Sequence, residues 1–184
     1  MCNHQNACTD QKDQELILRK PQVDDARKLI EYMKLVDSET KFLAREPGEF
    51  TLTVDQEIDF IKKAQDNKNM EFLVCEIEGE IAGNCSVGRI SNNKRFSHRA
   101  SMGLSVQKKY WGRGIGRKLM EACIDWCQNN GIEQLELEVV TSNERAKAMY
   151  EKLGFQLQGT KKHAMKYADG TYADEYQMVR FIGE

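Results

Sequence analysis

YWGRGIGRKL, residues 110–119, places glycines at three alternate positions, Gly112, Gly114 and Gly116. The segment before it, residues 101–106, alternates between small or polar and apolar side chains, as a half-buried strand does. The apolar residues after Gly114 recur at helical spacing. The sequence therefore predicts a strand, a glycine-rich turn, and a helix that begins at the glycines.

The predicted start of this helix is suited to binding an anion. The first N–H groups of a helix have no intrahelical partner, and the helix dipole gives this end a partial positive charge. Glycine lets an anion approach the N–H groups of residues 112–117 closely, and Arg113 and Arg117 add positive charge. These features predict a phosphate-binding turn, and the alternative is a turn whose glycines serve only close packing.

Two common nucleotide-binding motifs do not fit this turn. A Walker-type loop needs G-x-x-x-x-G-K followed by Ser or Thr, and neither Gly112 nor Gly114 begins such a pattern. A dinucleotide fingerprint, G-x-G-x-x-G, needs glycine where Arg117 stands. It also needs an acidic residue at the end of the next strand, where Val140 and Thr141 stand. The sequence therefore excludes both patterns.

The turn resembles the acyl-CoA loop of the GCN5-related N-acetyltransferases (GNAT), whose pattern is Gln or Arg, two residues, Gly, one residue, then Gly or Ala. The matching frame is residues 111–116, with Trp111 in place of the polar first residue. A second block is similar to the strand, asparagine, helix and tyrosine of that family: LELEV (135–139), SNERA (142–146) and MYEKLGF (149–155). The resemblance covers the chain from near Arg99 to Phe155.

The resemblance implies an α/β (α+β) fold of the GNAT type. Such a fold has a central mixed, mostly antiparallel sheet of about seven strands, helices on both faces, and a splay between the fourth and fifth strands. Periodicity predicts strands at 16–18, 71–78, 81–90, 99–106, 135–140, 155–165 and 172–182. It predicts helices at 24–36, 54–61, 114–131 and 143–154, with a loop at 37–53.

Length and charge limit the class of protein. A chain of 184 residues without a Pro/Gly/Ser-rich linker predicts one domain at 14–184, after a polar, disordered leader at 1–13. The 27 Lys and Arg are interleaved with 29 Asp and Glu, which argues against a nucleic-acid surface. No apolar run is long enough to span a membrane and no signal peptide is evident, so a cytoplasmic location is expected.

The cysteines predict buried thiols. Four of them lie in apolar strand or helix patterns and are expected to be free: Cys75, Cys85, Cys123 and Cys127. The pair on one helix face, Cys123 and Cys127, has no second His or Cys pair to complete a metal site, so no metal is expected. Cys2, His4 and Cys8 fall in the leader.

Acetyl transfer from a thioester to an amine requires a tethered acyl donor, an uncharged amine, a donor for the oxyanion, and a proton for the departing thiolate. The resemblance implies that the Leu104 N–H stabilises the oxyanion and that Gly103 precedes it either as a bulge or as an ordinary strand glycine. It implies these coenzyme-binding residues: Leu104, Val106, Gly112, Arg113, Gly114, Ile115, Gly116, Arg117 and Asn143.

Two residues of the second block have both a structural and a functional interpretation. Tyr150 shares a helix face with Ala146, Met149 and Leu153, which alone predicts a core aromatic. The resemblance implies that its hydroxyl, with an ordinary pKa near 10, protonates the thiolate. Asn143 is placed to cap a helix, and the resemblance implies that it also binds the pantetheine arm.

The general base is assigned to Glu138. Many relatives carry a glutamate on the strand at 99–106, but residues 97–106 contain no Asp or Glu. The pattern LEV-x-x-SN resembles relatives that acetylate ribosomal-protein N termini and use the glutamate there. Glu138 acting through water is one interpretation, and a solvated strand-edge carboxylate is the other. His98 and His163 are further candidates for the base.

The sequence thus predicts an acetyl-CoA-dependent acyltransferase without a metal, in which a small-molecule primary amine attacks directly in a ternary complex. A peptide N terminus is the alternative acceptor, because Asp37, Glu39 and Glu46 would suit either cation. A closed acidic pocket would favour the small amine, and a wide groove the peptide. A non-catalytic acyl-CoA-binding module is a further alternative. No nucleic acid or membrane partner is expected, and the resemblance is compatible with a homodimer through the C-terminal strands.

Overall fold

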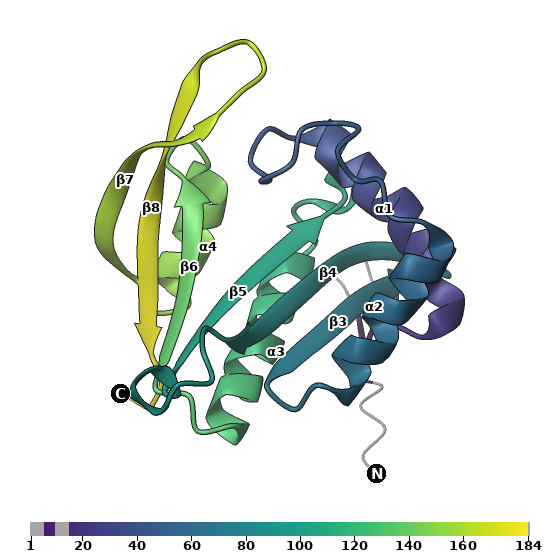
Figure 1. Ribbon diagram of the computed structural model, residues 1–184, viewed down its shortest axis with the longest axis horizontal. Coiled ribbons are helices and arrows are strands. Elements are labelled where there is room, and N and C mark those ends of the chain that lie inside the picture. Colours follow the sequence, from purple (N-terminus) through teal and green to yellow (C-terminus); the bar gives the residue numbers. More distant parts are fainter. Residues whose placement is uncertain (1–5, 10–14, 184) are drawn as a thin grey trace.

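The computed structural model describes residues 6–9 and 15–183 (Figure 1). The strands are β1 (Asn6–Thr9), β2 (Glu15–Arg19), β3 (Met70–Ile77), β4 (Glu80–Arg89), β5 (Arg99–Val106), β6 (Gln134–Val140), β7 (Gln156–Lys166) and β8 (Tyr172–Phe181). The helices are α1 (Ala26–Glu39), α2 (Val54–Asp66), α3 (Ile115–Asn129) and α4 (Glu144–Lys152), with short 3-10 turns η1 (Val23–Asp25), η2 (Lys94–Phe96) and η3 (Lys108–Tyr110). Every predicted helix and strand is present. Helix α2 runs further than predicted because Ala64 continues the buried face of Ile61.

All the strands belong to one sheet, in the order β1-β2-β3-β4-β5-β6-β8-β7. Strands β5 and β6 are parallel, and the other neighbouring pairs are antiparallel. The parallel pairing joins Arg99–Ser101 to Gln134–Glu136, and beyond it the two strands diverge (Figure 1). The predicted mixed sheet, with a splay between the strands at 99–106 and 135–140, is confirmed.

Strand β1 is an eighth strand that periodicity did not predict. It pairs with β2 in antiparallel fashion and covers an edge of β2 that would otherwise expose unpaired backbone groups. Its residues 6–9 fall within the leader predicted to be disordered, so for these four residues the structure differs from the prediction. The rest of that leader, including Cys2 and His4, lies outside the described residues.

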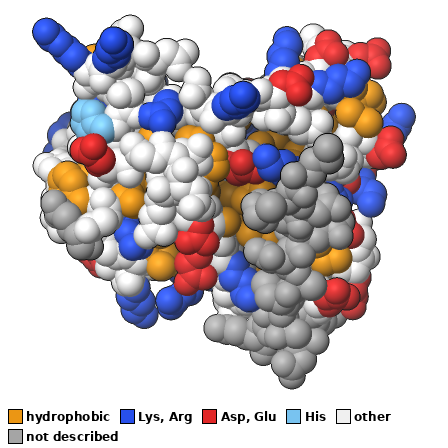
Figure 2. Space-filling model, turned by 90° about the horizontal axis from the view of Figure 1, so that it is seen from below, with side chains coloured by type: hydrophobic (Ala, Val, Ile, Leu, Met, Phe, Trp, Pro, Cys, Tyr) orange, Lys and Arg blue, Asp and Glu red, His pale blue; other side chains and the backbone are white. Residues whose placement is uncertain are grey.

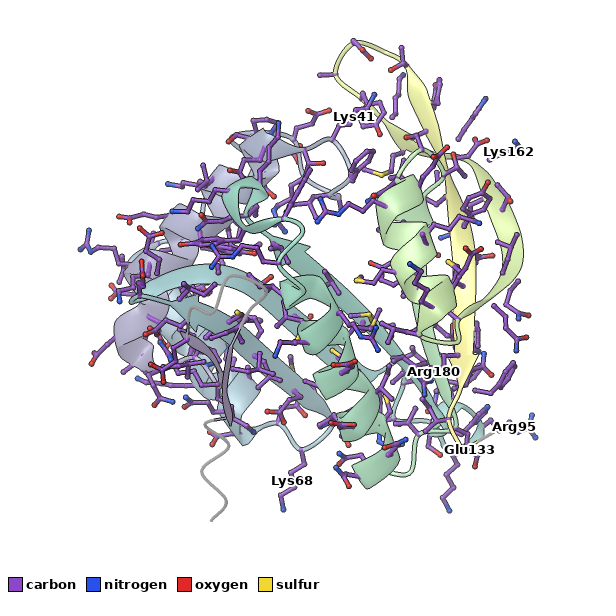
Figure 3. The ribbon with its side chains drawn as sticks, turned by 180° about the vertical axis from the view of Figure 1, so that it is seen from behind. Lys41, Lys68, Arg95, Glu133, Lys162 and Arg180 are labelled. Atoms are coloured by element: carbon purple, nitrogen blue, oxygen red, sulfur yellow. The ribbon has the colours of Figure 1, made fainter. Side chains whose placement is uncertain are left out.

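Two helices cover each face of the sheet, α1 and α2 on one side and α3 and α4 on the other (Figures 1 and 3). Alternate residues of the central strands therefore face different cores. On β3, Phe72 and Val74 pack with α1 and α2, whereas Cys75 and Ile77 pack with α3. One face of β4 and β5 therefore lies against α1, and the opposite face lies against α3.

The structure shows where the cysteines and the charged side chains lie. Four cysteines are buried free thiols, as predicted: Cys75, Cys85, Cys123 and Cys127. Within residues 6–9 and 15–183, none of the helices has the length and apolar character needed to cross a bilayer. Figure 2 shows one face of the molecule, on which basic and acidic side chains are interspersed around a centre of apolar side chains.

Candidate active site

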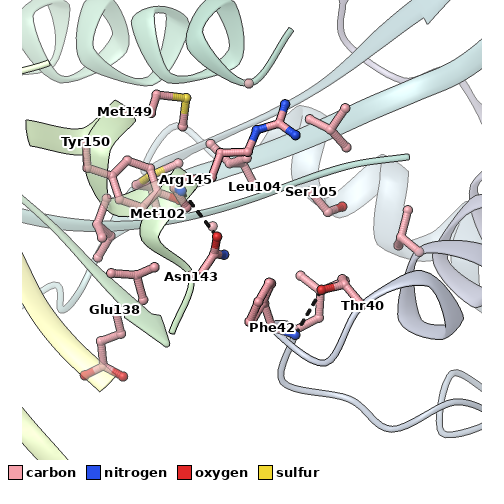
Figure 4. A pocket seen from close by; sticks show the side chains of 18 of the residues that line it. Thr40, Phe42, Met102, Leu104, Ser105, Glu138, Asn143, Arg145, Met149 and Tyr150 are labelled. Carbon is pink, nitrogen blue, oxygen red and sulfur yellow. Dashed lines mark hydrogen bonds between the residues drawn. The ribbon is translucent and has the colours of Figure 1, made fainter. Parts of the chain in front are cut away.

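A cavity of about 1070 Å³ opens where β5 and β6 diverge (Figure 4). Its walls come from β5, the glycine turn, the start of α4, and the facing sides of β6 and β8, and the α1–α2 loop adds a further wall. All but one of the residues predicted for catalysis or coenzyme binding line it: Leu104, Val106, Gly112, Gly114, Ile115, Gly116, Arg117, Glu138, Asn143 and Tyr150. The exception is Arg113.

The glycine turn has the conformation that anion binding requires. Gly112 and Gly114 have φ angles of +80° and +83°, in the left-handed region that glycine adopts without steric cost. Gly114 is the N-cap of α3, no side chain caps the helix, and the first turn of α3 contains no acidic residue. The N–H groups at the start of α3 are therefore not occupied by a cap and line the cavity.

The three arginines around the turn have different surroundings. Arg113 is buried, with its guanidinium 5.0 Å from the ring centre of Tyr110. Arg117 is exposed and pairs with Glu121 at 2.8 Å, one helical turn further on. A third arginine, Arg145 of α4, lines the cavity and was not predicted as a site residue. It lies in the SNERA segment, but no linear pattern indicates that its side chain reaches the turn.

The free edge of β5 faces the cavity. The Arg99 carbonyl accepts a hydrogen bond from Ile90, and the Gln107 N–H donates to Ala82. Because backbone groups of an antiparallel strand point alternately to the two sides, the odd-numbered residues of β5 bond to β4 and the even-numbered ones point toward the splay. The Leu104 N–H is therefore directed into the gap, as an oxyanion donor there requires.

Val106 lines the cavity, and one of its backbone groups is bonded within the protein. Its backbone carbonyl accepts a hydrogen bond from the indole Nε1 of Trp111 at 2.7 Å. That bond fixes the indole at the mouth of the glycine turn, and it leaves the Val106 N–H as the backbone group of this residue that can bind a ligand. Trp111 thus has a structural function where the family pattern carries a polar side chain.

Helix α4 positions the two polar groups of the second block. Asn143 caps α4, because its Oδ1 accepts a hydrogen bond from the Ala146 N–H at 3.2 Å. Its amide N–H groups donate to no protein atom within the described ranges, so capping and ligand binding are compatible. Tyr150 is buried except where it lines the cavity, and burial raises the pKa of its hydroxyl to about 12. The hydroxyl is therefore protonated at neutral pH.

Two carboxylates stand together on the opposite wall. Glu138 of β6 accepts hydrogen bonds from Lys161 Nζ at 2.5 Å and from Gln177 Nε2 at 3.4 Å. Glu175 of β8 lies across from Lys161, on the same side of the sheet as Glu138. Burial, followed by the nearby charge of Glu138, raises the pKa of the Glu175 carboxyl. Glu175 was missed because only the β6–β8 register shows that it lies beside Glu138.

The acidic residues expected to attract a cationic substrate instead bond to the protein. Asp37 is buried and forms a two-bond ion pair with Arg45, at 2.8 and 3.0 Å. Glu39 accepts a hydrogen bond from the Lys108 N–H at 2.7 Å. Glu46 accepts one from the Ala168 N–H at 3.0 Å. The carboxylates that line the cavity come from β6, β8 and the start of α4 instead.

The α1–α2 loop is joined to the tip of the β7–β8 hairpin. Besides the contact between Glu46 and Ala168, the Tyr167 hydroxyl donates to the Lys41 carbonyl at 3.1 Å, and Figure 3 shows Lys41 close to the hairpin tip. We call these two contacts the clasp. It connects the α1–α2 loop, which lines the cavity, to the hairpin whose strand β8 also lines it.

The two histidines considered as bases do not line the cavity. His98 lies just before β5, where its carbonyl accepts hydrogen bonds from Glu133 and Gln134. His163 lies in a bulge of β7 and stacks on Tyr172, with ring centres 4.6 Å apart. Neither is placed to take a proton from an amine at the splay.

Comparisons with known proteins agree with this geometry. The model of the acetyltransferase (GNAT) family matches residues 31–155. The L-amino acid N-acetyltransferase AaaT of Escherichia coli (strain K12) is 32% identical over 121 residues, or 65% of this chain and 73% of that protein. The N-alpha-acetyltransferase RimI of Mycobacterium tuberculosis (strain ATCC 25618 / H37Rv) is 31% identical over 106 residues, or 58% and 63%. An acetyltransferase of the GNAT family from Streptococcus pneumoniae has a TM-score of 0.85 at 30% identity, covering 92% of this chain and 100% of that structure.

Proposed function

Because the chain belongs to the acetyltransferase (GNAT) family, we propose that it transfers an acetyl group from acetyl-CoA to the primary amine of a small molecule, by direct attack in a ternary complex. The observation that carries the proposal is the convergence on one cavity of an uncapped helix start, a free strand edge and a protonated tyrosine. We also propose that residues 14–184 form a single domain, since both core clusters pack on one sheet.

The glycine turn and the β5 edge fit acetyl-CoA. Two left-handed glycines and the uncapped start of α3 supply N–H donors for the diphosphate. We assign the Leu104 carbonyl, the Val106 N–H and the side-chain amide of Asn143 to the amide groups of the pantetheine arm, which leaves the Leu104 N–H for the thioester oxygen. Together they direct the thioester toward the β6–β8 wall.

The carboxylates on that wall serve the acceptor. An ammonium group is attracted to the Glu138–Glu175 pair, and it must lose a proton before its nitrogen can attack. Glu138 takes this proton through a bridging water, while Lys161 holds the carboxylate in place at 2.5 Å. The amine nitrogen then forms a bond to the thioester carbonyl carbon.

The remaining steps use Leu104 and Tyr150. The Leu104 N–H donates to the carbonyl oxygen as negative charge develops on it. When the C–S bond breaks, the Tyr150 hydroxyl donates its proton to the sulfur. The raised pKa of Tyr150 keeps the hydroxyl protonated until that step. The products are the N-acetylated amine and coenzyme A. Of the two protons that the ammonium loses, the first passes from Glu138 to solvent and the second restores the Tyr150 hydroxyl, so one proton is released in each turnover.

The clasp favours a small acceptor. A peptide substrate needs an open groove between the α1–α2 loop and the hairpin, and the contacts of Tyr167 and Glu46 bridge these segments. Phe42 and Leu43 add an apolar wall opposite the carboxylates. An amine on a compact, partly apolar body fits this arrangement. AaaT is named for L-amino acids and RimI for N-alpha acetylation, so the relatives leave both acceptor classes to be tested.

The test is a screen of simple amines, amino acids and short peptides for acetyl-CoA-dependent release of free thiol, with mass spectrometry of the product. We expect a product heavier by one acetyl group for a small amine, and slower release with peptides. Faster turnover of peptides would replace the small-amine proposal with N-terminal acetylation. Tight binding of acetyl-CoA with no acceptor turned over would support a non-catalytic binding module instead.

A further inference from the structure

Arg145 stands beside the glycine turn without belonging to it. We infer that Arg145 binds a phosphate of acetyl-CoA, and so brings from α4 a cation that, unlike Arg117, has no ion-pair partner within the described ranges. The inference rests on the proposed function, because it assigns a further residue to the same coenzyme site. It concerns the position at which this chain departs from the family pattern, where Trp111 replaces the polar residue.

The geometry begins with Trp111. The bond from its indole Nε1 to the Val106 carbonyl, 2.7 Å long, locks the ring against the end of β5. The guanidinium carbon of Arg145 lies 5.2 Å from the centre of that ring. A guanidinium stacked on an aromatic face is held by cation–π attraction and loses rotational freedom. Trp111 therefore acts as a platform that orients Arg145.

The oriented guanidinium lies close to the turn. A Cβ placed on Gly112 would come 4.0 Å from Nη2 of Arg145, so the charged group borders the backbone that carries the predicted anion site. Figure 4 shows Arg145 on the same side of the pocket as Asn143 and Leu104. A phosphate oxygen bound to the amides of the turn would thus lie within reach of an arginine.

The donors of Arg145 are available to a ligand. Across residues 6–9 and 15–183, Arg145 forms neither a hydrogen bond nor an ion pair, and its guanidinium lies over the Trp111 ring. By contrast, Arg117 is paired with Glu121, and Arg113 is buried against Tyr110 outside the cavity lining. Bonds from guanidinium to phosphate are charge-assisted and are stronger than neutral ones. Of these three arginines, Arg145 is the one that both lines the cavity and has no ion pair among the described residues.

The first test is calorimetry of coenzyme A binding to the full-length protein and its Arg145→Ala and Arg145→Lys variants. We expect the Kd of Arg145→Ala to rise about 10- to 100-fold and that of Arg145→Lys to rise less, since lysine keeps the charge but not the stacked fork. The matched control is Lys147→Ala. Lys147 lies two residues along α4, pairs with Glu151 and does not line the cavity, so its Kd should change less than about twofold.

Dephospho-CoA identifies the phosphate. If Arg145→Ala weakens binding of coenzyme A and dephospho-CoA by the same factor, the contact is to the diphosphate. If only coenzyme A binding is weakened, the contact is to the 3′-phosphate. Unchanged affinity of Arg145→Ala for coenzyme A would overturn the inference and leave the proposed function intact. Failure of the wild-type protein to bind coenzyme A would overturn both.

A second variant tests the platform. Trp111→Leu removes both the stacking surface and the bond to Val106, and Trp111→Phe removes only the bond. If the platform orients Arg145, the loss on Arg145→Ala should shrink in a Trp111→Leu background, because the arginine is no longer held over the turn. Additive losses in this double-mutant cycle would contradict the orienting role. Circular dichroism and thermal melting show whether each variant is folded.

Discussion

The Tyr167 hydroxyl donates a hydrogen bond to the Lys41 carbonyl at 3.1 Å, and so joins segments 126 residues apart in the sequence. Together with the bond from Ala168 to Glu46, it fastens the β7–β8 hairpin to the α1–α2 loop, and both segments contribute residues to the lining of the cavity. Because both contacts are exposed, each contributes about 1 kcal/mol or less to holding the loop. Their effect is expected on substrate selection more than on global stability.

Opening the clasp should therefore change acceptor preference. In the double variant Tyr167→Phe, Glu46→Ala, we expect the KM for the small amine to rise about threefold to tenfold, and the rate with peptides to rise relative to that with small amines. Steady-state assays on both acceptor classes measure this ratio. Lys162→Ala, which removes an exposed ion pair to Asp174 in the same hairpin, is the control. An unchanged ratio in the clasp variant would contradict the selection role.

Removing the hydroxyl of Tyr150 should slow the chemical step. For Tyr150→Phe we expect kcat to fall about 10²-fold, with little change in the KM for acetyl-CoA, because the acid acts only when the thiolate departs. Thermal stability should change little, since no described protein group bonds to the hydroxyl. Turnover equal to wild type would show that another group protonates the sulfur.

The raised pKa of Tyr150 also has a consequence for stability. Its folded value of about 12 exceeds the ordinary value of 10.0, so the contribution of the protonated phenol to folding is complete below pH 10 and is lost as the pH rises toward 12. Comparing the melting temperatures of the wild type and Tyr150→Phe between about pH 8 and pH 11 measures this contribution. The wild type should lose stability faster than the variant above pH 10, and parallel curves would argue against burial of the phenol.

Glu175 should control the acid side of the pH–rate profile. Burial, followed by the charge of Glu138, raises the pKa of Glu175, so the charge beside the acceptor amine changes as Glu175 titrates. Glu175→Gln removes this titration and should move the acid limb of kcat/KM downward. Profiles from about pH 4 to pH 8 measure the shift. Glu136→Gln is the control, because Glu136 pairs with Arg99 instead. An acid limb that stays in place would remove Glu175 from the mechanism.

The raised pKa of Glu175 also makes the stability of the protein depend on pH. Because the folded pKa of Glu175 is raised, its contribution to stability is present below the ordinary value of 4.5 and is lost as the pH rises through the folded value. Glu175→Gln should therefore raise the melting temperature at neutral pH and have a smaller effect near pH 4. The opposite pattern would mean that Lys161 stabilises the ionised form.

Gly114 should be needed for coenzyme binding and for the turn itself. Gly114→Ala forces a side chain into a left-handed conformation, at a cost of about 1 kcal/mol, although a Cβ there meets no atom within 4 Å. We expect weaker coenzyme A binding in calorimetry together with that loss of stability. Gly170→Ala is matched, with φ of +85° and equally open space at the hairpin turn, and should lose stability without losing affinity. If Gly114→Ala and Gly170→Ala bind coenzyme A with equal affinity, the turn at Gly114 does not contribute to coenzyme binding.

Local pattern was sufficient for most of the fold and for part of the site. The helix after Gly114, the cap at Asn143 and the alternation on β5 each depend on residues a few positions apart, so they can be predicted without the tertiary structure. Strand β1 was missed because its sequence is short and polar and has no strand periodicity. It forms because it pairs with the edge of β2. The residue types around the cavity were foreseen, but their partners were not.

The amino-acid sequence by itself determined the order of elements, the glycine turn and the family to which the chain belongs, because these follow from local conformational preferences and the spacing of a few residues. Only the tertiary structure decided which charged groups face the cavity. It brings Glu175 beside Glu138 through the β6–β8 register, and Arg145 over Trp111 through the placement of α4. It also commits Asp37 and Glu39 to internal contacts. Such pairings join distant segments, and their geometry depends on strand register and helix packing that no local pattern encodes.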